Sequence, residues 1–312
     1  MKKLFRKITG SIHQHKESRR LIHSDGYRFM RAFPPGHFYS PIPDFGEINE
    51  RSSSIFNKKV KDLPGIDLRK PEQLGRIDSF KSYYKELPWS DEVRIETLRY
   101  RFDNIYFSYG DAITLYSMMR HFGPKRIIEV GSGFSSAAML DVDELFFDNE
   151  IEFTFIEPYP DRLRALLSDE DLSRFTLLDQ PVQQVDLSLF EELDKGDILF
   201  IDSSHVSKTD SDVNDLIHRI LPHLKLGVII HFHDILWPFE YPKKWLKAGR
   251  AWNEAYLVRA FLQYNSSFEI LFFNSYLEHH HRQKLRETLP LMLRQPPAKM
   301  TFGNSSLWLR KK

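Results

Sequence analysis

Seven short apolar runs recur along the second part of the chain. Each is rich in β-branched and aromatic residues and is bounded by polar or turn residues, which predicts a β-strand. The runs are apolar at nearly every position, a pattern typical of strands that are buried on both faces. The predicted strands are 126–131, 152–158, 174–179, 197–202, 227–234, 268–275 and 305–311.

Segments of helical character separate these strands. The clearest is amphipathic, DAITLYSMMRHF (111–122), and it ends before Gly123, a residue type that often terminates helices. Strands that alternate with helices form βαβ units, and hence a parallel sheet covered on both faces. We therefore expect an α/β fold, a three-layer doubly wound Rossmann-like sheet. The other predicted helices are 135–147, 160–168, 188–194, 211–223, 253–264 and 279–294.

The first 104 residues have a different character. They contain Pro/Gly punctuation such as FPPGHFYSPIPDFG and few long apolar periods, which predicts an irregular arm on the substrate side of a domain formed by residues 105–312. Residues 1–31 carry nine Lys/Arg and two acids, so they form either a solvated helix or a weak contact with an anionic membrane surface. No apolar run approaches the ~20 residues of a membrane-spanning helix.

Composition narrows the class of protein. The formal net charge of the 312 residues is +1, which argues against a protein whose whole surface binds nucleic acid. The chain has no cysteine, which excludes disulfides, thiolate zinc sites and cysteine nucleophiles. A reducing compartment fits this composition, and we expect a cytoplasmic protein.

Ligands of open α/β sheets bind beyond the carboxyl ends of the strands, so the residues that close each strand are the candidates for a site. The first strand ends in EVGSGFSS (129–136), where Gly131 and Gly133 allow a tight turn and close backbone approach to a ligand. Exposed N–H groups follow at the start of the next helix, around Ser135. This turn predicts a cofactor site.

The second and third strands extend this prediction. Glu157 closes the second strand, where a carboxylate can accept both hydroxyls of a ribose, and Asp179 closes the third, where it can meet an adenine edge. Ser136 stands where the dinucleotide fingerprint has its third small residue, so the glycines alone leave a nicotinamide enzyme open. The chain has no evident Tyr-x-x-x-Lys pair or other hydride-transfer group.

Four stretches together resemble class I S-adenosylmethionine-dependent methyltransferases, and most of all bacterial small-molecule enzymes of the Methyltransferase-24 type. They are IIEVGSGFSS, FIEPYP, ILFIDSSH and GVIIHFHDILWPFEYPKKW, within a resemblance that covers roughly residues 105–312. It implies a seven-strand sheet with an antiparallel last strand. It also implies that Glu129, Gly131 and Gly133 hold the methionine end of S-adenosylmethionine and that Glu157 holds its ribose.

The resemblance also raises the question of a metal. Related catechol-type O-methyltransferases bind a divalent cation such as Mg²⁺ through acids that match Asp202 and Asp234. Their third ligand is an Asn directly after the second acid, and Ile235 stands there in this chain. If the fourth and fifth strands are neighbours, ~4.8 Å apart, the two acids can share one cation. The other interpretation of Asp234 is an acid that holds the 235–252 loop.

Histidines near these acids are candidates for acid–base chemistry. His205 follows Asp202 by three residues and is our candidate base for a substrate hydroxyl, the alternative being a loop or helix-capping histidine. Strand parity places His231 under a flanking helix as a packed residue. His233 lies at the end of its strand, where it either supports the site or contacts the substrate.

The sequence thus predicts S-adenosylmethionine-dependent methyl transfer to an oxygen of a small molecule such as a sugar or secondary metabolite. His205 and Asp202 are its expected catalytic residues. Two other classes remain: a nicotinamide oxidoreductase or metal-dependent hydroxylase on the same kind of sheet, and a binding protein without turnover. The aromatic stretches WPFEYPKKW and PPGHFYSP are either walls of the substrate site or a cluster that seals the sheet.

Overall fold

The structure is a computed structural model that describes residues 31–296 and 302–312. Residues 31–56 and Lys247–Ala251 fall in a small unit, and Asn57–Leu246 with Trp252–Lys312 form the large one. The expectations for residues 1–30 lie outside the described part of the chain. Within that part, no helix is long and apolar enough to cross a membrane.

The small unit contains two short helices, α3 (Phe45–Glu50) and α4 (Ser52–Ile55). Asp44 caps α3, because its carboxylate accepts hydrogen bonds from the N–H groups of Gly46 and Glu47. Phe38 and Tyr39 are largely exposed. The described part of the small unit thus consists of short helices, turns and exposed aromatic rings.

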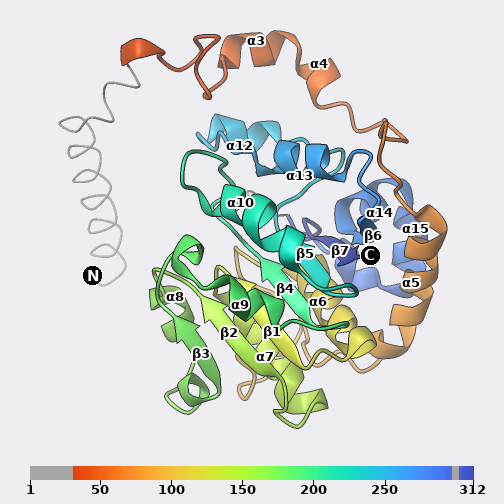
Figure 1. Ribbon diagram of the computed structural model, residues 1–312. Helices are drawn as coiled ribbons and strands as arrows, with labels where there is room; N and C mark the ends of the chain where they lie inside the picture. The colour runs from red at the N-terminus through yellow and green to blue at the C-terminus, as the bar shows by residue number, and fades with distance from the viewer. Residues whose placement is uncertain (1–30, 297–301) are drawn as a thin grey trace, which may run out of the picture. The chain divides into compact units, whose positions relative to one another are not determined.

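The large unit is built on a seven-stranded sheet with the order β3-β2-β1-β4-β5-β7-β6 (Figure 1). Strands β1 to β5 pair in parallel, and β7 runs antiparallel to both β5 and β6. The predicted α/β fold with an antiparallel last strand is confirmed. The strands are β1 (Arg126–Val130), β2 (Glu152–Ile156), β3 (Phe175–Leu178), β4 (Ile198–Ile201), β5 (Ile229–Phe232), β6 (Phe268–Phe273) and β7 (Leu307–Lys311).

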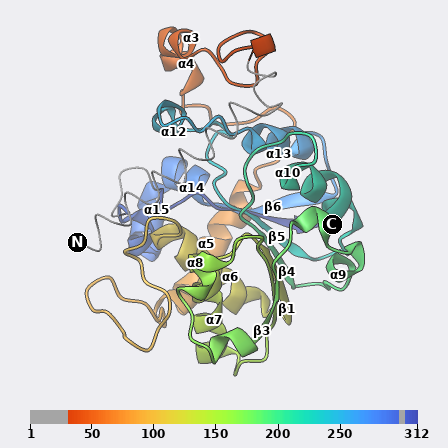
Figure 2. The ribbon, with the colours of Figure 1, turned by 90° about the vertical axis from the view of Figure 1, so that its left-hand side faces the viewer.

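Helices cover both faces of this sheet. Figure 2 shows α5, α6 and α7 on one side and α9 and α10 on the other. The helices are α5 (Lys70–Tyr84), α6 (Tyr109–Phe122), α7 (Phe134–Phe146), α8 (Asp161–Arg164), α9 (Leu187–Glu191), α10 (Asp212–Asp215), α11 (Leu221–His223), α12 (Lys243–Lys247), α13 (Glu254–Leu262), α14 (Asn274–His280) and α15 (Arg282–Thr288). Short turns are η1 (Asp171–Ser173), η2 (Val182–Gln184), the π-helical η3 (Leu216–Ile220) and η4 (Pro290–Leu293).

Burial explains the strand pattern. Every residue of β4, β5 and β6 is buried, as expected for strands covered on both faces. Helix α6 is buried along most of its length and ends at Gly123, whose φ of 59° is the left-handed conformation common at helix ends. The predicted single helix 279–294 is instead three short elements. Pro290, which has no N–H to continue α15, begins the last of them.

The core extends upstream of the predicted boundary at residue 105. Ile77 and Phe80 of α5 are fully buried, and Trp89 and Phe102 are nearly so. Residues 57–104 therefore contribute packing to the large unit. The functional division into an arm and a methyltransferase domain stays a prediction.

Candidate active site

The sheet reverses its strand order between β1 and β4, and the turn after β1 lies at this point. Gly131 has a φ of 83°, and a Cβ there would lie 2.0 Å from the backbone oxygen of Asp202. Its N–H donates to the carbonyl oxygen of Ile156 at 3.0 Å. Only glycine fits this position, which is wedged between the ends of β2 and β4.

Glu129 braces the glycine turn from below. The hydroxyls of Ser135 and Ser136 donate to its two carboxylate oxygens, each at 2.5 Å, and Ser136 Oγ accepts the N–H of Gly133 at 2.9 Å. Burial raises the pKa of Glu129 to about 8, against the opposing effect of the two serine hydrogen bonds. The side chain is fully buried, so in this arrangement it holds the shape of the turn.

Glu157 lies at the lip of the same turn. Its carboxylate accepts the N–H of Ser132 at 3.1 Å and the N–H of Tyr159 at 2.9 Å. The hydroxyl of Ser132 is buried without a hydrogen-bond partner, as expected for an atom whose partner is a ligand. Beside them, the exposed Asp179 closes β3. These groups fit a cofactor that brings hydroxyl donors to Glu157 and a polar group to the turn.

Aromatic and basic side chains cover the turn. The rings of Tyr106 and Phe134 stack with centroids 5.9 Å apart, and the Arg162 guanidinium lies 4.1 Å from the Tyr106 ring centroid. A Cβ on Gly133 would lie 3.1 Å from Cδ of Arg162. Tyr106 and Arg162 thus form a partial cover over the region where the sequence predicts a cofactor.

The second half of the site is a cluster of carboxylates and imidazoles where β4 and β5 end. These strands are neighbours, as expected, so Asp202 and Asp234 close adjacent strands. His205 Nε2 lies 3.4 Å from Oδ1 of Asp202 and 3.8 Å from Oδ2 of Asp234. His205 and Asp234 both have positive φ values, 61° and 56°, which are uncommon for such residues and frequent at functional sites.

Glu254 holds the other side of the His205 ring. This residue begins α13 and is 1% exposed, and its Oε2 lies 2.8 Å from His205 Nδ1. Its Oε1 accepts the Ser203 hydroxyl at 2.8 Å. The indole of Trp252 packs on the imidazole with centroids 4.3 Å apart. The ring is fixed from three directions, which leaves Nε2 directed at the two aspartates.

Charge coupling determines the protonation of this cluster. Burial opposes a charge on His205, but hydrogen bonds to Asp202 and Glu254 outweigh it and raise the pKa to about 10. Burial likewise opposes ionisation of Asp202, yet the His233 and His205 charges hold its pKa well below the usual range. Burial raises the pKa of Asp234. At neutral pH the resting site therefore pairs a His205 imidazolium with an ionised Asp202.

His233 and His231 extend the cluster into the core. His233 Nδ1 lies 3.3 Å from Asp202 Oδ1, and its Nε2 lies 3.2 Å from the Ser305 hydroxyl, so it supports Asp202 from below. The His231 ring stacks on Phe200 with centroids 3.7 Å apart, and its Nε2 binds the Ser306 hydroxyl. Burial lowers the pKa of His231 well below its usual value. The packed role predicted for His231 is confirmed.

Asp111 anchors this region and was not expected there. This fully buried residue of α6 accepts hydrogen bonds from the N–H and hydroxyl groups of both Ser305 and Ser306. Glu254, the partner of His205, was likewise missed. Both contacts join residues far apart in the sequence, so no local motif signals them.

The donor set does not fit a divalent metal. Asp202 and Asp234 already face His205 Nε2, whose positive charge competes with a cation for the same oxygens. Ile235, where the expected third ligand would stand, is fully buried and apolar. Among residues 31–296 and 302–312, no group of three or more His, Asp or Glu side chains could hold a metal ion. We derive no catalytic step through a metal.

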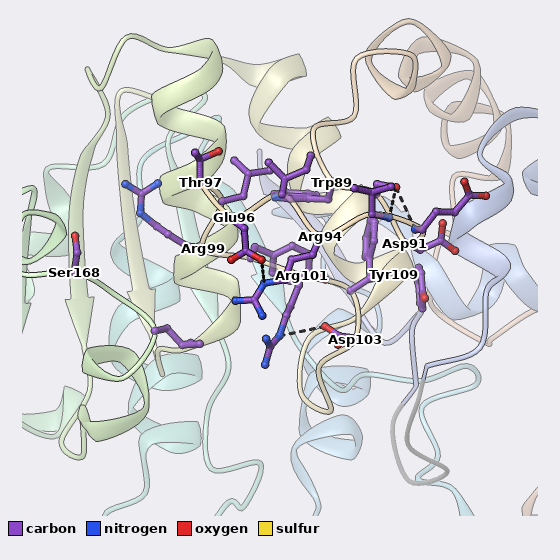
Figure 3. A pocket seen from close by; sticks show the side chains of 18 of the residues that line it. Trp89, Asp91, Arg94, Glu96, Thr97, Arg99, Arg101, Asp103, Tyr109 and Ser168 are labelled. Atoms are coloured by element: carbon purple, nitrogen blue, oxygen red, sulfur yellow. Dashed lines mark hydrogen bonds and ion pairs between the residues drawn. The ribbon is translucent and has the colours of Figure 1, made fainter.

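A separate cavity of about 630 Å³ lies along the segment 89–103 (Figure 3). Two ion pairs lie among its lining residues, Arg94 with Glu96 at 3.3 Å and Arg101 with Asp103 at 3.1 Å. Arg99 is fixed by carboxylates of the core, including Asp141. Asp91 pairs with Arg294 at 3.1 Å.

Comparison with known proteins agrees with this geometry. A model of the family described as "Methyltransferase domain" matches residues 128–235. An uncharacterised protein of Archaeoglobus fulgidus is 40% identical over 189 residues, which cover 58% of this chain and 84% of that protein.

Solved structures of methyltransferases are also similar, at lower identity. SAH-bound PaMTH1 of Podospora anserina has a TM-score of 0.40 at 14% identity, over 88% of this chain and 99% of that one. The O-methyltransferase TomG of Streptomyces achromogenes, in complex with SAM, has a TM-score of 0.39 at 10% identity, over 85% and 96%. Residues 128–235 thus form a methyltransferase domain, and the seven-stranded sheet with its antiparallel last strand is consistent with a class I S-adenosylmethionine-dependent methyltransferase.

Proposed function

We propose that this methyltransferase acts on a hydroxyl oxygen of a small molecule, with His205 as the base. The observation that supports this best is the fixed His205 ring. Glu254 holds Nδ1 at 2.8 Å, and Nε2 faces the two aspartates that close β4 and β5. A histidine whose one nitrogen is held by a carboxylate is a common arrangement for removing a hydroxyl proton with the other nitrogen.

The chain's own residues have three tasks in this proposal. Glu129, Gly131, Gly133 and Ser135 shape the turn, and Glu157 accepts the ribose hydroxyls. Bound S-adenosylmethionine supplies a methyl group on a positively charged sulfur. The acceptor hydroxyl donates its hydrogen bond to the neutral Nε2 of His205, which receives the proton as the oxygen is methylated, and the Asp202 carboxylate beside Nε2 stabilises the imidazolium that forms.

The raised pKa of His205 sets a condition on this mechanism. Its pKa of about 10 means that only a small fraction of the free protein carries a neutral ring at neutral pH. The rate should therefore rise with pH through the neutral range and level off near the His205 pKa. The sequence raises an alternative, in which Asp202 and Asp234 bind a metal. The addition of EDTA to the assay described next tests it.

The test is product analysis with S-adenosylmethionine and a panel of sugars, phenols and amines. We expect products one methyl group heavier than the acceptor, with an alkali-stable ether at a former hydroxyl in their NMR spectra. We also expect turnover to be unchanged by EDTA. Methylation confined to nitrogen would overturn the proposal. Loss of turnover in EDTA, restored by Mg²⁺, would return the two aspartates to a metal-binding role.

A further inference from the structure

A second cavity, of about 490 Å³, is formed by the segments that follow β5 and β6 and precede β7. Leu236 follows β5, Ser275 and Glu278 come from α14, and Asn304 lies just before β7. All these residues belong to the large unit. The volume is in the range of small-molecule sites, and β5 and β6 present their carboxyl ends here, where open α/β sheets bind ligands.

Two residues of the cavity wall lie close in the sequence to residues of the acid–base cluster. Leu236 lies two residues beyond Asp234, so their Cα atoms are at most ~7 Å apart. Asn304 directly precedes Ser305, whose hydroxyl contacts His233 and Asp111. A molecule of modest size in the cavity therefore lies within a few residues of the proposed catalytic centre.

The charged side chains that line the cavity are mostly cationic. Four cationic side chains line it, and Glu278 is the one carboxylate among its described lining residues. The cations are Lys58, Lys244, Arg282 and Arg294. Glu278 forms an ion pair with Arg282 at 2.5 Å. Arg294 pairs with Asp91 at 3.1 Å, so both arginines have a carboxylate partner and the positive charge of the wall is that of the two lysines.

The lysines are held at the wall. Lys244 Nζ lies 3.8 Å from the centroid of the Phe302 ring, which keeps the ammonium beside the cavity. Burial lowers the pKa of Lys58, against the opposing charge of Glu278. Bringing an anion to Lys58 would offset this desolvation and restore its ordinary protonation. Lysine ammonium groups and arginine guanidinium groups are the usual ligands of oxyanions.

We propose that this cavity binds an oxyanion group of the methyl acceptor: a phosphate, a sulfate or a carboxylate. The proposal deepens the proposed function and rests on it. The basic cavity takes the anionic end of the acceptor, while its hydroxyl end reaches Asp202 and His205. A basic cavity at one end and the acid–base cluster at the other give the acceptor one orientation, which selects the oxygen that is methylated.

The first experiment measures anion binding without turnover. Inorganic phosphate, sulfate and acetate are titrated into the protein by calorimetry at constant ionic strength, since added salt itself screens charges. We expect saturable binding of at least one of them. Replacement of both Lys58 and Lys244 by alanine should weaken it at least about tenfold, the size expected when charge-assisted hydrogen bonds are lost. The anion with the highest affinity indicates which oxyanion group of the acceptor the cavity binds: phosphate, sulfate or, for acetate, a carboxylate.

Two controls accompany this titration: a lysine variant outside the cavity and a measurement of cofactor affinity. Lys81→Ala changes an exposed lysine of α5 outside the cavity and should leave anion affinity unaltered. S-adenosylhomocysteine affinity should be unchanged in every variant, which shows that the fold is intact. No saturable binding by the wild type, or equal affinity in the double variant, would overturn the anion site while leaving the methyltransferase proposal standing.

The second experiment uses acceptors that differ only in charge. A neutral sugar, its phosphate ester and its uronic acid are compared as methyl acceptors. We expect kcat/KM to be higher for an anionic member, and we expect the double lysine variant to remove that preference. A preference for the neutral sugar would contradict the anion site. Absence of methyl transfer to all three, with anion binding intact, would count against the O-methylation of sugars instead.

Discussion

The cofactor turn and the acid–base cluster are built in different ways. The turn is local: Ser135 and Ser136 bind Glu129 across six and seven residues, and Glu157 reaches Ser132 across 25. The cluster joins distant segments: His205 meets Glu254 across 49 residues, and Asp111 meets Ser305 across 194. A local turn can be recognised as a motif, whereas a distant cluster depends on how the whole sheet and its insertions pack.

The two regions also differ in charge. Burial raises the pKa of Glu129 to about 8, so the acid of the turn loses charge and serves as a brace. Asp202 remains ionised because two histidines face it. Glu129 is thus a buried brace without charge, whereas the cluster is an ionic network in which each group sets the protonation of the next. Variants in one region should therefore change cofactor affinity, and variants in the other should change turnover and its pH dependence.

The largest expected effect is that of His205→Ala. Removing a base typically lowers the rate by about 10² to 10⁴-fold. Cofactor affinity should stay within a few-fold, because Glu157 and the glycine turn remain intact. The measurements are kcat with a saturating acceptor and S-adenosylhomocysteine affinity by calorimetry.

His218→Ala is the matched control for this variant. His218 is an exposed residue of η3, and its replacement should leave both quantities unchanged. Normal turnover in His205→Ala would reject the base. A parallel loss of cofactor affinity would show that the two regions are not separate.

A smaller effect, on cofactor affinity and not on turnover, is expected for Glu157→Ala. The loss of hydrogen bonds to a charged group should weaken cofactor binding by roughly 1.5–3 kcal/mol, or about 10- to 100-fold. At saturating cofactor, kcat should be close to that of the wild type. Calorimetry gives the affinity, and Glu150→Ala, which removes an exposed acid nearby in the sequence, is the control. Normal affinity combined with lost turnover would move Glu157 to the acceptor side.

The same contrast shows what could be predicted from the sequence. Local patterns predict the apolar strands, the glycine turn and the acid that closes the second strand. The seven-stranded topology follows from the family resemblance of these motifs. The neighbouring placement of Asp202 and Asp234 could be predicted because strand order in this fold is regular.

The partners of the histidines could not be predicted in this way. Glu254 begins an ordinary helix, and Asp111 was visible only as an acid near a helix start. The sequence around each residue does not indicate a buried carboxylate, because the groups that hydrogen-bond to it come from distant parts of the chain. The positive charge of His205 also depends on them, so a pKa near the unperturbed ~6.5 is the natural expectation from the sequence alone.

The smallest expected effect is a shift in pH dependence for Glu254→Gln. The Glu254 carboxylate raises the pKa of His205, so its neutral replacement should lower that pKa, by on the order of one unit for a single opposite charge. For the wild type, kcat/KM should rise with pH and level off near pH 10, since the neutral ring is the active form of the base. In Glu254→Gln the same limb should lie at lower pH. Glutamine keeps the hydrogen-bonding shape, so cofactor affinity should not change. A merely structural Glu254 would lower the rate at every pH without moving the limb, and that profile would contradict its influence on the His205 proton.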